Sequence, residues 1–141
     1  MKISNSTKLT IIGFAVTFGL AAFAAAEDAA SKLPPASSQS GVTYATDIKP
    51  VLDKSCVKCH SGDKPKARLK LDNLANILKG GKDGKVVVAG DSAKSMLVLA
   101  AAHATKDPDT WMPPKRFQDK FPPLKPDQIG LVRAWIDQGA K

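Results

Sequence analysis

The stretch Cys56-Val57-Lys58-Cys59-His60 decides how the rest of the chain is interpreted. Two cysteines three positions apart lie on one side of a helical turn, where both thiols can reach the same edge of a flat ring. The histidine that comes next can present its imidazole to a metal at the ring centre. A Cys-x-x-Cys-His run is typical of c-type haem attachment. The stretch therefore predicts one covalent haem c, with thioether bonds from Cys56 and Cys59 and iron ligation by His60.

Three other interpretations of these residues compete with haem. A thioredoxin-like redox pair requires a βαβ setting, which the pattern of this chain lacks. A disulfide between Cys56 and Cys59 is compatible with an oxidising compartment. A Cys₂His₂ zinc site exists by count, but His60 directly follows Cys59 and His103 lies far outside zinc-finger spacing. Haem remains the leading hypothesis.

Residues 1–26 have the pattern of a secretory signal peptide. Lys2 and Lys8 form a positive start, an apolar run begins at Leu9, and three alanines ending at Ala26 precede an acidic pair. The apolar run is just long enough to be a candidate membrane span. Its alanine-rich end favours cleavage after Ala26, so membrane attachment is expected only if the segment is retained. We expect a periplasmic or otherwise exported protein, which agrees with haem attachment outside the cytoplasm.

Composition and length restrict the kind of protein that lies beyond the leader. The chain has 141 residues and a formal net charge of +8, which falls to +6 when the two leader lysines are removed. Residues 27–43 are rich in Ala, Ser and Pro and predict a flexible linker, and residues 44–141 predict one small cytochrome c domain. A buried cofactor would form much of so small a core. An exported chain without an aromatic–basic pattern is a poor candidate for nucleic-acid binding.

The spacing of apolar residues predicts a mainly α fold with short extended segments. A first helix, capped by Thr46 or Asp47, carries the haem motif at its C-terminal end. Further helices are expected over 72–80, 90–102 and 126–139. The residues expected on the inner faces are Ile48, Leu52, Cys56, Leu74, Ile77, Leu78, Met96, Leu97, Leu99, Ala100, Ile129, Val132, Trp135 and Ile136. The segments expected to be extended are 67–71 and 86–88.

The second iron ligand has three candidates. Met112 stands between Trp111 and two prolines, in a loop whose backbone the prolines restrict. A thioether ligand stabilises ferrous iron and raises the reduction potential. Met96 lies on an apolar helix, where methionine ordinarily fills the core, and His103 has the ordinary role of a histidine at a helix end. We predict Met112 as the ligand, with His103, Met96 and an open site as alternatives.

Six motifs occur together in order: Cys56-Val57-Lys58-Cys59-His60, Leu69-Lys70-Leu71-Asp72, Gly80-Gly81, Gly90-Asp91 with Ser95, Met112-Pro113-Pro114, and Trp135-Ile136-Asp137-Gln138-Gly139-Ala140. Over about residues 44–140 the chain resembles the planctomycete-type cytochrome c domain, a branch of the small class I cytochrome c-like fold. The resemblance implies His60 and Met112 as axial ligands and a crossing of the first and last helices beside the haem. The chain departs from the family in a longer link over 115–123, and in Lys125 where a Ser or Thr cap is usual.

These observations predict an exported monohaem c-type cytochrome that carries single electrons between redox partner proteins and is not an enzyme. The alternative is a peroxidase-like or gas-binding haem protein with an open or displaceable sixth ligand, for which His103 is the uncommitted histidine. A structural subunit of a larger redox complex is a further alternative.

Between residues 54 and 70 the chain carries six basic side chains, and Asp63 is the only acid. This segment predicts docking to acidic partners, and the alternative is a well-solvated surface without a docking role.

Overall fold

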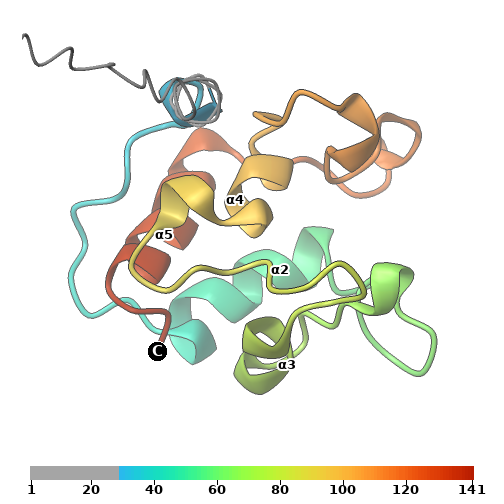
Figure 1. Ribbon diagram of the computed structural model, residues 1–141, viewed down its shortest axis with the longest axis horizontal. Coiled ribbons are helices and arrows are strands. Elements are labelled where there is room, and N and C mark those ends of the chain that lie inside the picture. The colour runs from blue at the N-terminus through green and yellow to red at the C-terminus, as the bar shows by residue number, and fades with distance from the viewer. Residues whose placement is uncertain (1–28) are drawn as a thin grey trace, which may run out of the picture.

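The computed structural model describes residues 29–141, so the predicted signal peptide lies outside the described residues. Its helices are α2 (Lys49–Ser55), α3 (Leu74–Lys79), α4 (Met96–Ala101) and α5 (Pro126–Asp137) (Figure 1). Short helical turns cover Tyr44–Ile48, Lys66–Arg68, Ser92–Lys94, Pro108–Thr110 and Lys115–Phe117. Within the described residues no strand forms, and a single β-bridge joins Gly81 to Gly84. The predicted mainly α fold is confirmed.

The first helix begins earlier than predicted. Thr43 is its N-cap, and its hydroxyl accepts a hydrogen bond from the backbone N–H of Thr46. Asp47 lies inside the first turn and accepts a hydrogen bond from the Thr43 amide at 2.9 Å. The predicted caps at Thr46 and Asp47 are therefore wrong. Asp47 still stabilises the start of the helix, because a carboxylate within the first turn also accepts from N–H groups that have no intrahelical partner. The helix continues through α2 with Ile48 and Leu52 buried, as predicted.

α5 is the central element of the core. Its expected inner face is confirmed, and Trp135 and Ile136 are fully buried. The Tyr44 and Trp135 rings lie 6.1 Å apart, so the first helix packs on α5 through its opening turn. Lys125 offers no capping side chain, but its amide donates to Gln128 Oε1 at 2.9 Å. This bond satisfies the N-cap amide. It is the half of a capping box that does not depend on a Ser or Thr side chain at the N-cap.

α3 and its preceding loop differ from the sequence predictions. Asn73, rather than Asp72, caps α3 by accepting from the Asn76 amide at 2.9 Å. Ile77 is buried as expected, but Leu78 is 37% exposed, because a helix of this length places only one side against the core. The segment 67–71 is not simply extended. Ala67 and Arg68 adopt positive φ angles of 53° and 52°, which turn the chain beneath the haem motif.

The predicted helix over 90–102 is divided at Ser95. Asp91 caps the short turn Ser92–Lys94, and Ser95 then takes an extended conformation before α4 begins. The Ser95 hydroxyl accepts from the Val88 amide at 2.9 Å, which anchors the segment 86–88 beside α4. This segment forms no strand and runs as an irregular stretch without a helix, in agreement with the expected extended segment over 86–88.

Residues 33–42 lie along α5, which corrects the expectation of a flexible linker for this stretch (Figure 1). Leu33 and Val42 are buried, and the Ser37 amide donates to the Gly130 carbonyl at 2.9 Å. A Cβ on Gly130 would lie 2.7 Å from the Pro35 carbonyl oxygen. Arg133 of α5 and Gln138, which directly follows α5, also donate to carbonyls of this segment. Proline prevents a helix here but leaves carbonyls free to accept from a neighbour.

The structure describes no helix within residues 29–141 that is long and apolar enough to cross a membrane. The start of the domain near residue 44 and the signal peptide stay predictions.

Candidate functional site

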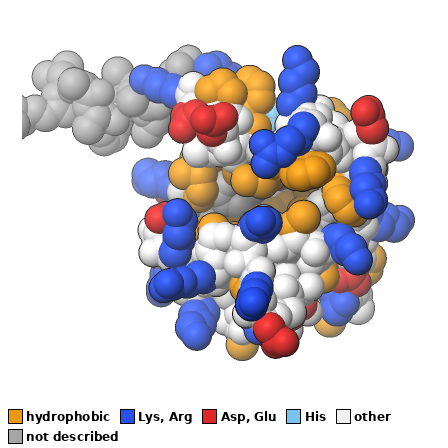
Figure 2. All heavy atoms as spheres, turned by 90° about the vertical axis from the view of Figure 1, so that its right-hand side faces the viewer, with side chains coloured by type: hydrophobic (Ala, Val, Ile, Leu, Met, Phe, Trp, Pro, Cys, Tyr) orange, Lys and Arg blue, Asp and Glu red, His pale blue; other side chains and the backbone are white. Residues whose placement is uncertain are grey.

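A cavity of about 510 Å³ lies between the haem motif, α4 and the loop after α4. This volume is within the roughly 300–1,000 Å³ of small-molecule and cofactor sites. The larger aliphatic side chains that line it are Leu52, Leu69, Leu71, Val86, Leu97, Val98, Leu124, Ile129 and Val132. Figure 2 shows a hollow with hydrophobic side chains in and around it and lysine and arginine side chains gathered about its rim. The cavity can hold a large, flat, apolar molecule.

The four predicted site residues, Cys56, Cys59, His60 and Met112, all line this cavity. The haem motif folds as a tight turn, in which the Cys59 and His60 amides both donate to the Cys56 carbonyl at 3.1 Å. This turn directs two sulfur atoms and one imidazole to the same space. Met112 reaches it from a distant part of the chain. The structure thus brings together two thiols, an imidazole and a thioether.

The Cys56 thiol differs from those of redox-active cysteine pairs. Burial, with a smaller contribution from Cys59, raises the pKa of Cys56 to about 12. In Cys-x-x-Cys redox motifs the attacking thiol has a lowered pKa. Both cysteines are free. Across residues 29–141, no three Cys, His, Asp or Glu side chains converge as metal ligands, so the zinc alternative gains no support.

His60 is oriented by the loop immediately after it. The side chain is 8% exposed, and Nδ1 lies 3.3 Å from the Leu69 carbonyl oxygen. Because a carbonyl oxygen only accepts, Nδ1 carries the hydrogen and Nε2 keeps a lone pair for a metal. Burial lowers the pKa of His60 and so favours this neutral form. The sequence analysis singled out Leu69-Lys70-Leu71 as a motif, but it did not predict that the Leu69 carbonyl orients the His60 ring.

The Met112 loop is held against α4. The Met112 amide donates to the Ala100 carbonyl at 3.0 Å, and Gln118 Nε2 donates to the Pro113 carbonyl at 3.1 Å. The Met112–Pro113 peptide bond is cis. Met96 also lines the cavity but is 44% exposed. His103 is not part of the cavity lining, and its ring is stacked on Trp111 at 5.0 Å.

The long link before α5 covers part of the cavity, a role that the sequence did not predict. Phe117 and Phe121 both line the cavity. The link is tied to α2 through Ser55, whose hydroxyl donates to the Pro122 carbonyl at 2.8 Å. The sequence feature that could have predicted this role is the presence of two phenylalanines in the link before α5. The link therefore adds apolar lining to the site.

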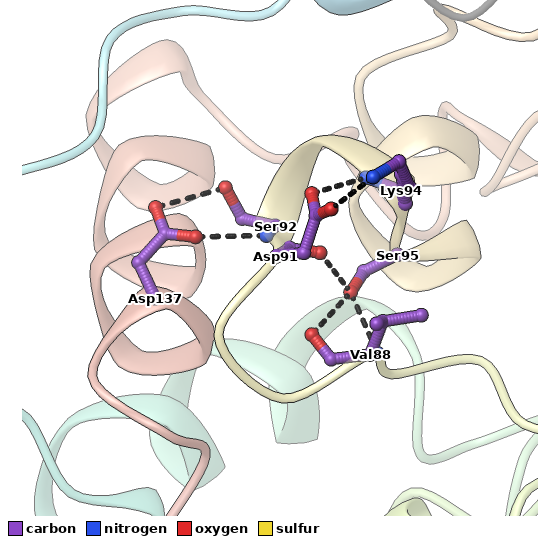
Figure 3. Close-up of polar contacts among 6 residues, drawn as sticks. All are labelled: Val88, Asp91, Ser92, Lys94, Ser95 and Asp137. Atoms are coloured by element: carbon purple, nitrogen blue, oxygen red, sulfur yellow. Dashed lines mark hydrogen bonds and ion pairs between the residues drawn. The ribbon is translucent and has the colours of Figure 1, made fainter.

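A polar cluster around two buried serines fixes α4 relative to α5 (Figure 3). Asp137 accepts from the amide and the hydroxyl of Ser92, at 2.8 Å and 3.0 Å. The Ser95 hydroxyl donates to the Asp91 carbonyl at 2.9 Å and accepts from the Val88 amide. Ser92 and Ser95 are almost completely buried, so these bonds replace water. The cluster explains why the Gly90-Asp91, Ser95 and Asp137 motifs occur together: they position α4, which lines the cavity.

The family model for the planctomycete cytochrome C matches residues 56–116. This match confirms the resemblance over residues 56–116, which include the haem motif and Met112, whereas the motif over 135–140 lies outside it. No curated protein and no solved structure gives a significant match. A cytochrome c domain indicates a c-type haem protein. The donor set fits that cofactor, since two adjacent thiols and an imidazole with a free Nε2 face one apolar cavity.

Proposed function

We propose that this chain, which carries a planctomycete-type cytochrome c domain over residues 56–116, is an exported monohaem cytochrome that transfers single electrons between redox proteins. One observation carries the proposal. Cys56, Cys59, His60 and Met112 line the same apolar cavity although they come from two distant parts of the chain. Two thioethers, one imidazole and one methionine sulfur are the complete protein contribution to a His/Met-ligated haem c.

The residues of the cavity have separate tasks in this function. Haem bound there supplies reversible one-electron chemistry. Cys56 and Cys59 would hold the haem through two thioether bonds, each formed by addition of S–H across one vinyl group, which needs no oxidant. His60 ligates through Nε2 while the Leu69 carbonyl holds Nδ1–H. Met112 supplies a soft ligand, and the apolar lining excludes water; both favour the ferrous state.

The ligand set is tested with the ferric and ferrous holoprotein. We expect a weak near-infrared sulfur-to-iron band in the ferric protein and no rapid carbon monoxide binding in the ferrous protein. Met112→Ala should abolish the band and lower the reduction potential, whereas Met96→Leu, which alters the other methionine of the lining, should leave both unchanged. A band that survives Met112→Ala but disappears in Met96→Leu would contradict the assignment. Rapid carbon monoxide binding to the wild type would instead favour a haem enzyme or gas sensor.

Export and haem stoichiometry are tested by intact mass together with a pyridine haemochrome spectrum. We propose a mature chain that starts at Glu27 and carries one haem. A mass that includes residues 1–26 would mean that the leader is retained, and the protein would then be membrane-attached.

The partners are proposed to be acidic redox proteins that dock near the cavity opening. Along the segment that contains the haem motif, the exposed basic residues are Lys54, Lys58, Lys64, Lys66 and Arg68, and Lys70 is half-buried. Figure 2 shows basic side chains spread around the hollow. A positive rim steers a negative partner, and it raises the association rate more than the affinity.

Stopped-flow electron transfer with an acidic partner protein tests the docking proposal. The rate should fall steeply with ionic strength, because exposed charges are screened beyond roughly 10 Å at 0.1 M salt. Lys58→Glu and Lys66→Glu should slow the reaction at low salt. Lys141→Glu is the matched control, since the C-terminus lies at the edge of the molecule opposite to the face in Figure 2. Equal slowing by the control, or a flat salt dependence, would leave these lysines as solubility residues.

A further inference from the structure

His103 lies behind Met112 and not in the cavity. Its Nε2 is 3.3 Å from the Met112 carbonyl oxygen, and because a carbonyl only accepts, His103 is the donor. Its ring is stacked on Trp111, with centroids 5.0 Å apart and an interplanar angle of 6°. We propose that His103 is a positioning residue that holds the Met112 loop so that the methionine sulfur faces the cavity. This inference rests on the proposed ligation by Met112.

The backbone of Met112 is fixed from two sides. Its amide donates to the Ala100 carbonyl at 3.0 Å, and its carbonyl accepts from His103. Trp111, the residue before it, is fixed as well, because the indole Nε1 donates to the Thr105 carbonyl at 3.2 Å. All of these partners belong to α4 or to the turn directly after it. The end of α4 therefore forms a rigid support for the loop, and His103 is the residue that contacts both Trp111 and Met112.

The backbone at position 103 favours the residue found there. His103 has a positive φ of 55°, a region in which histidine, asparagine and aspartate are enriched among the non-glycine residues. This conformation turns the chain away from the helix direction at the end of α4. Asparagine could adopt it but has no ring to stack, and phenylalanine has a ring but no donor. Histidine supplies the flat face and the N–H together.

A fixed loop matters because the iron–thioether bond is weak. When the loop is held in place, little conformational freedom is lost on ligation, and the sulfur returns quickly after each dissociation. Without the hydrogen bond and the ring stack, the dissociated form should become about tenfold more populated. An added ligand that binds only after the methionine has dissociated should then bind about tenfold faster.

The experiment compares ferric holoprotein variants by the near-infrared band and by the rate of cyanide binding. His103→Gly removes the ring and the donor without introducing backbone strain, since glycine adopts positive φ freely. We expect a weaker band, a lower reduction potential and about tenfold faster cyanide binding. Ala102→Gly is the matched control, because it loosens the same end of α4 but leaves the contacts of His103 intact. It should lower thermal stability while the band and the cyanide rate stay at the wild-type values.

Two results overturn the inference and leave Met112 ligation standing. One is a His103→Gly protein with the wild-type band and cyanide rate. The other is an Ala102→Gly protein that loses the band to the same extent, which would attribute the effect to loosening of α4 alone. A wild-type protein without the band would overturn Met112 ligation itself, and the inference with it.

Discussion

Gly130→Ala is expected to change the sign of its effect on stability according to whether residues 33–37, which contain Pro35, are present. In an isolated helix, alanine is more favourable than glycine by about 1 kcal/mol. Here the new Cβ would lie 2.7 Å from the Pro35 carbonyl oxygen, a distance at which the backbone must move. The segment would lose the bond from the Ser37 amide to the Gly130 carbonyl, which contributes about 1 kcal/mol. It would also partly expose Leu33, whose full burial contributes roughly 1.5–3 kcal/mol.

The sum of these effects predicts that Gly130→Ala destabilises the mature protein by about 1–2 kcal/mol. In a variant that lacks residues 27–37 the obstacle is gone, and the same substitution should stabilise by about 1 kcal/mol. Chemical denaturation of the four proteins, read by the helical circular dichroism signal, completes the double-mutant cycle. If Gly130→Ala stabilises the full mature chain, or has the same effect in both backgrounds, residues 33–42 do not pack on α5 as described.

Three further outcomes are expected from other parts of the molecule. The mature protein should keep its haem on a denaturing gel, whereas a chain with both Cys56→Ala and Cys59→Ala should lose it; haem extracted from the wild type by acid acetone would exclude thioethers. Asp137→Ala should lower the free energy of unfolding by about 1–3 kcal/mol, because it leaves the buried Ser92 amide without an acceptor; a loss below about 0.5 kcal/mol in chemical denaturation would contradict this. Ser55→Ala should leave the free energy of unfolding within about 1 kcal/mol of the wild type, because the bond from Ser55 to Pro122 is exposed. A larger loss in calorimetry would contradict this expectation.

Local patterns in the sequence were sufficient for several features. The haem motif is one tight turn of adjacent residues, so its chemistry can be interpreted without knowing the fold. The inner face of α5 follows from the spacing of Ile129, Val132 and Trp135, and Gly80 ends α3 with a positive φ of 85° that glycine adopts easily. These features depend on residues within one or two turns of each other.

Other features were decided by which segments meet in space. His103 appeared as a possible iron ligand, but the turn at the end of α4 places its ring against Trp111, outside the cavity lining. Leu78 has the helical spacing of a core residue, yet only one side of α3 meets the core.

The segment 33–42 has the composition of a linker. Composition indicates only what a segment can form by itself, so it predicted no packing here. Whether it packs depends on a neighbour, and here Gly130 lacks the Cβ that would keep the chain away. The sequence by itself determined the chemistry of the attachment motif and the local helices. Only the tertiary structure decided which distant side chains support Met112 and which segments cover α5, because those contacts join residues whose separation along the chain carries no periodic signal.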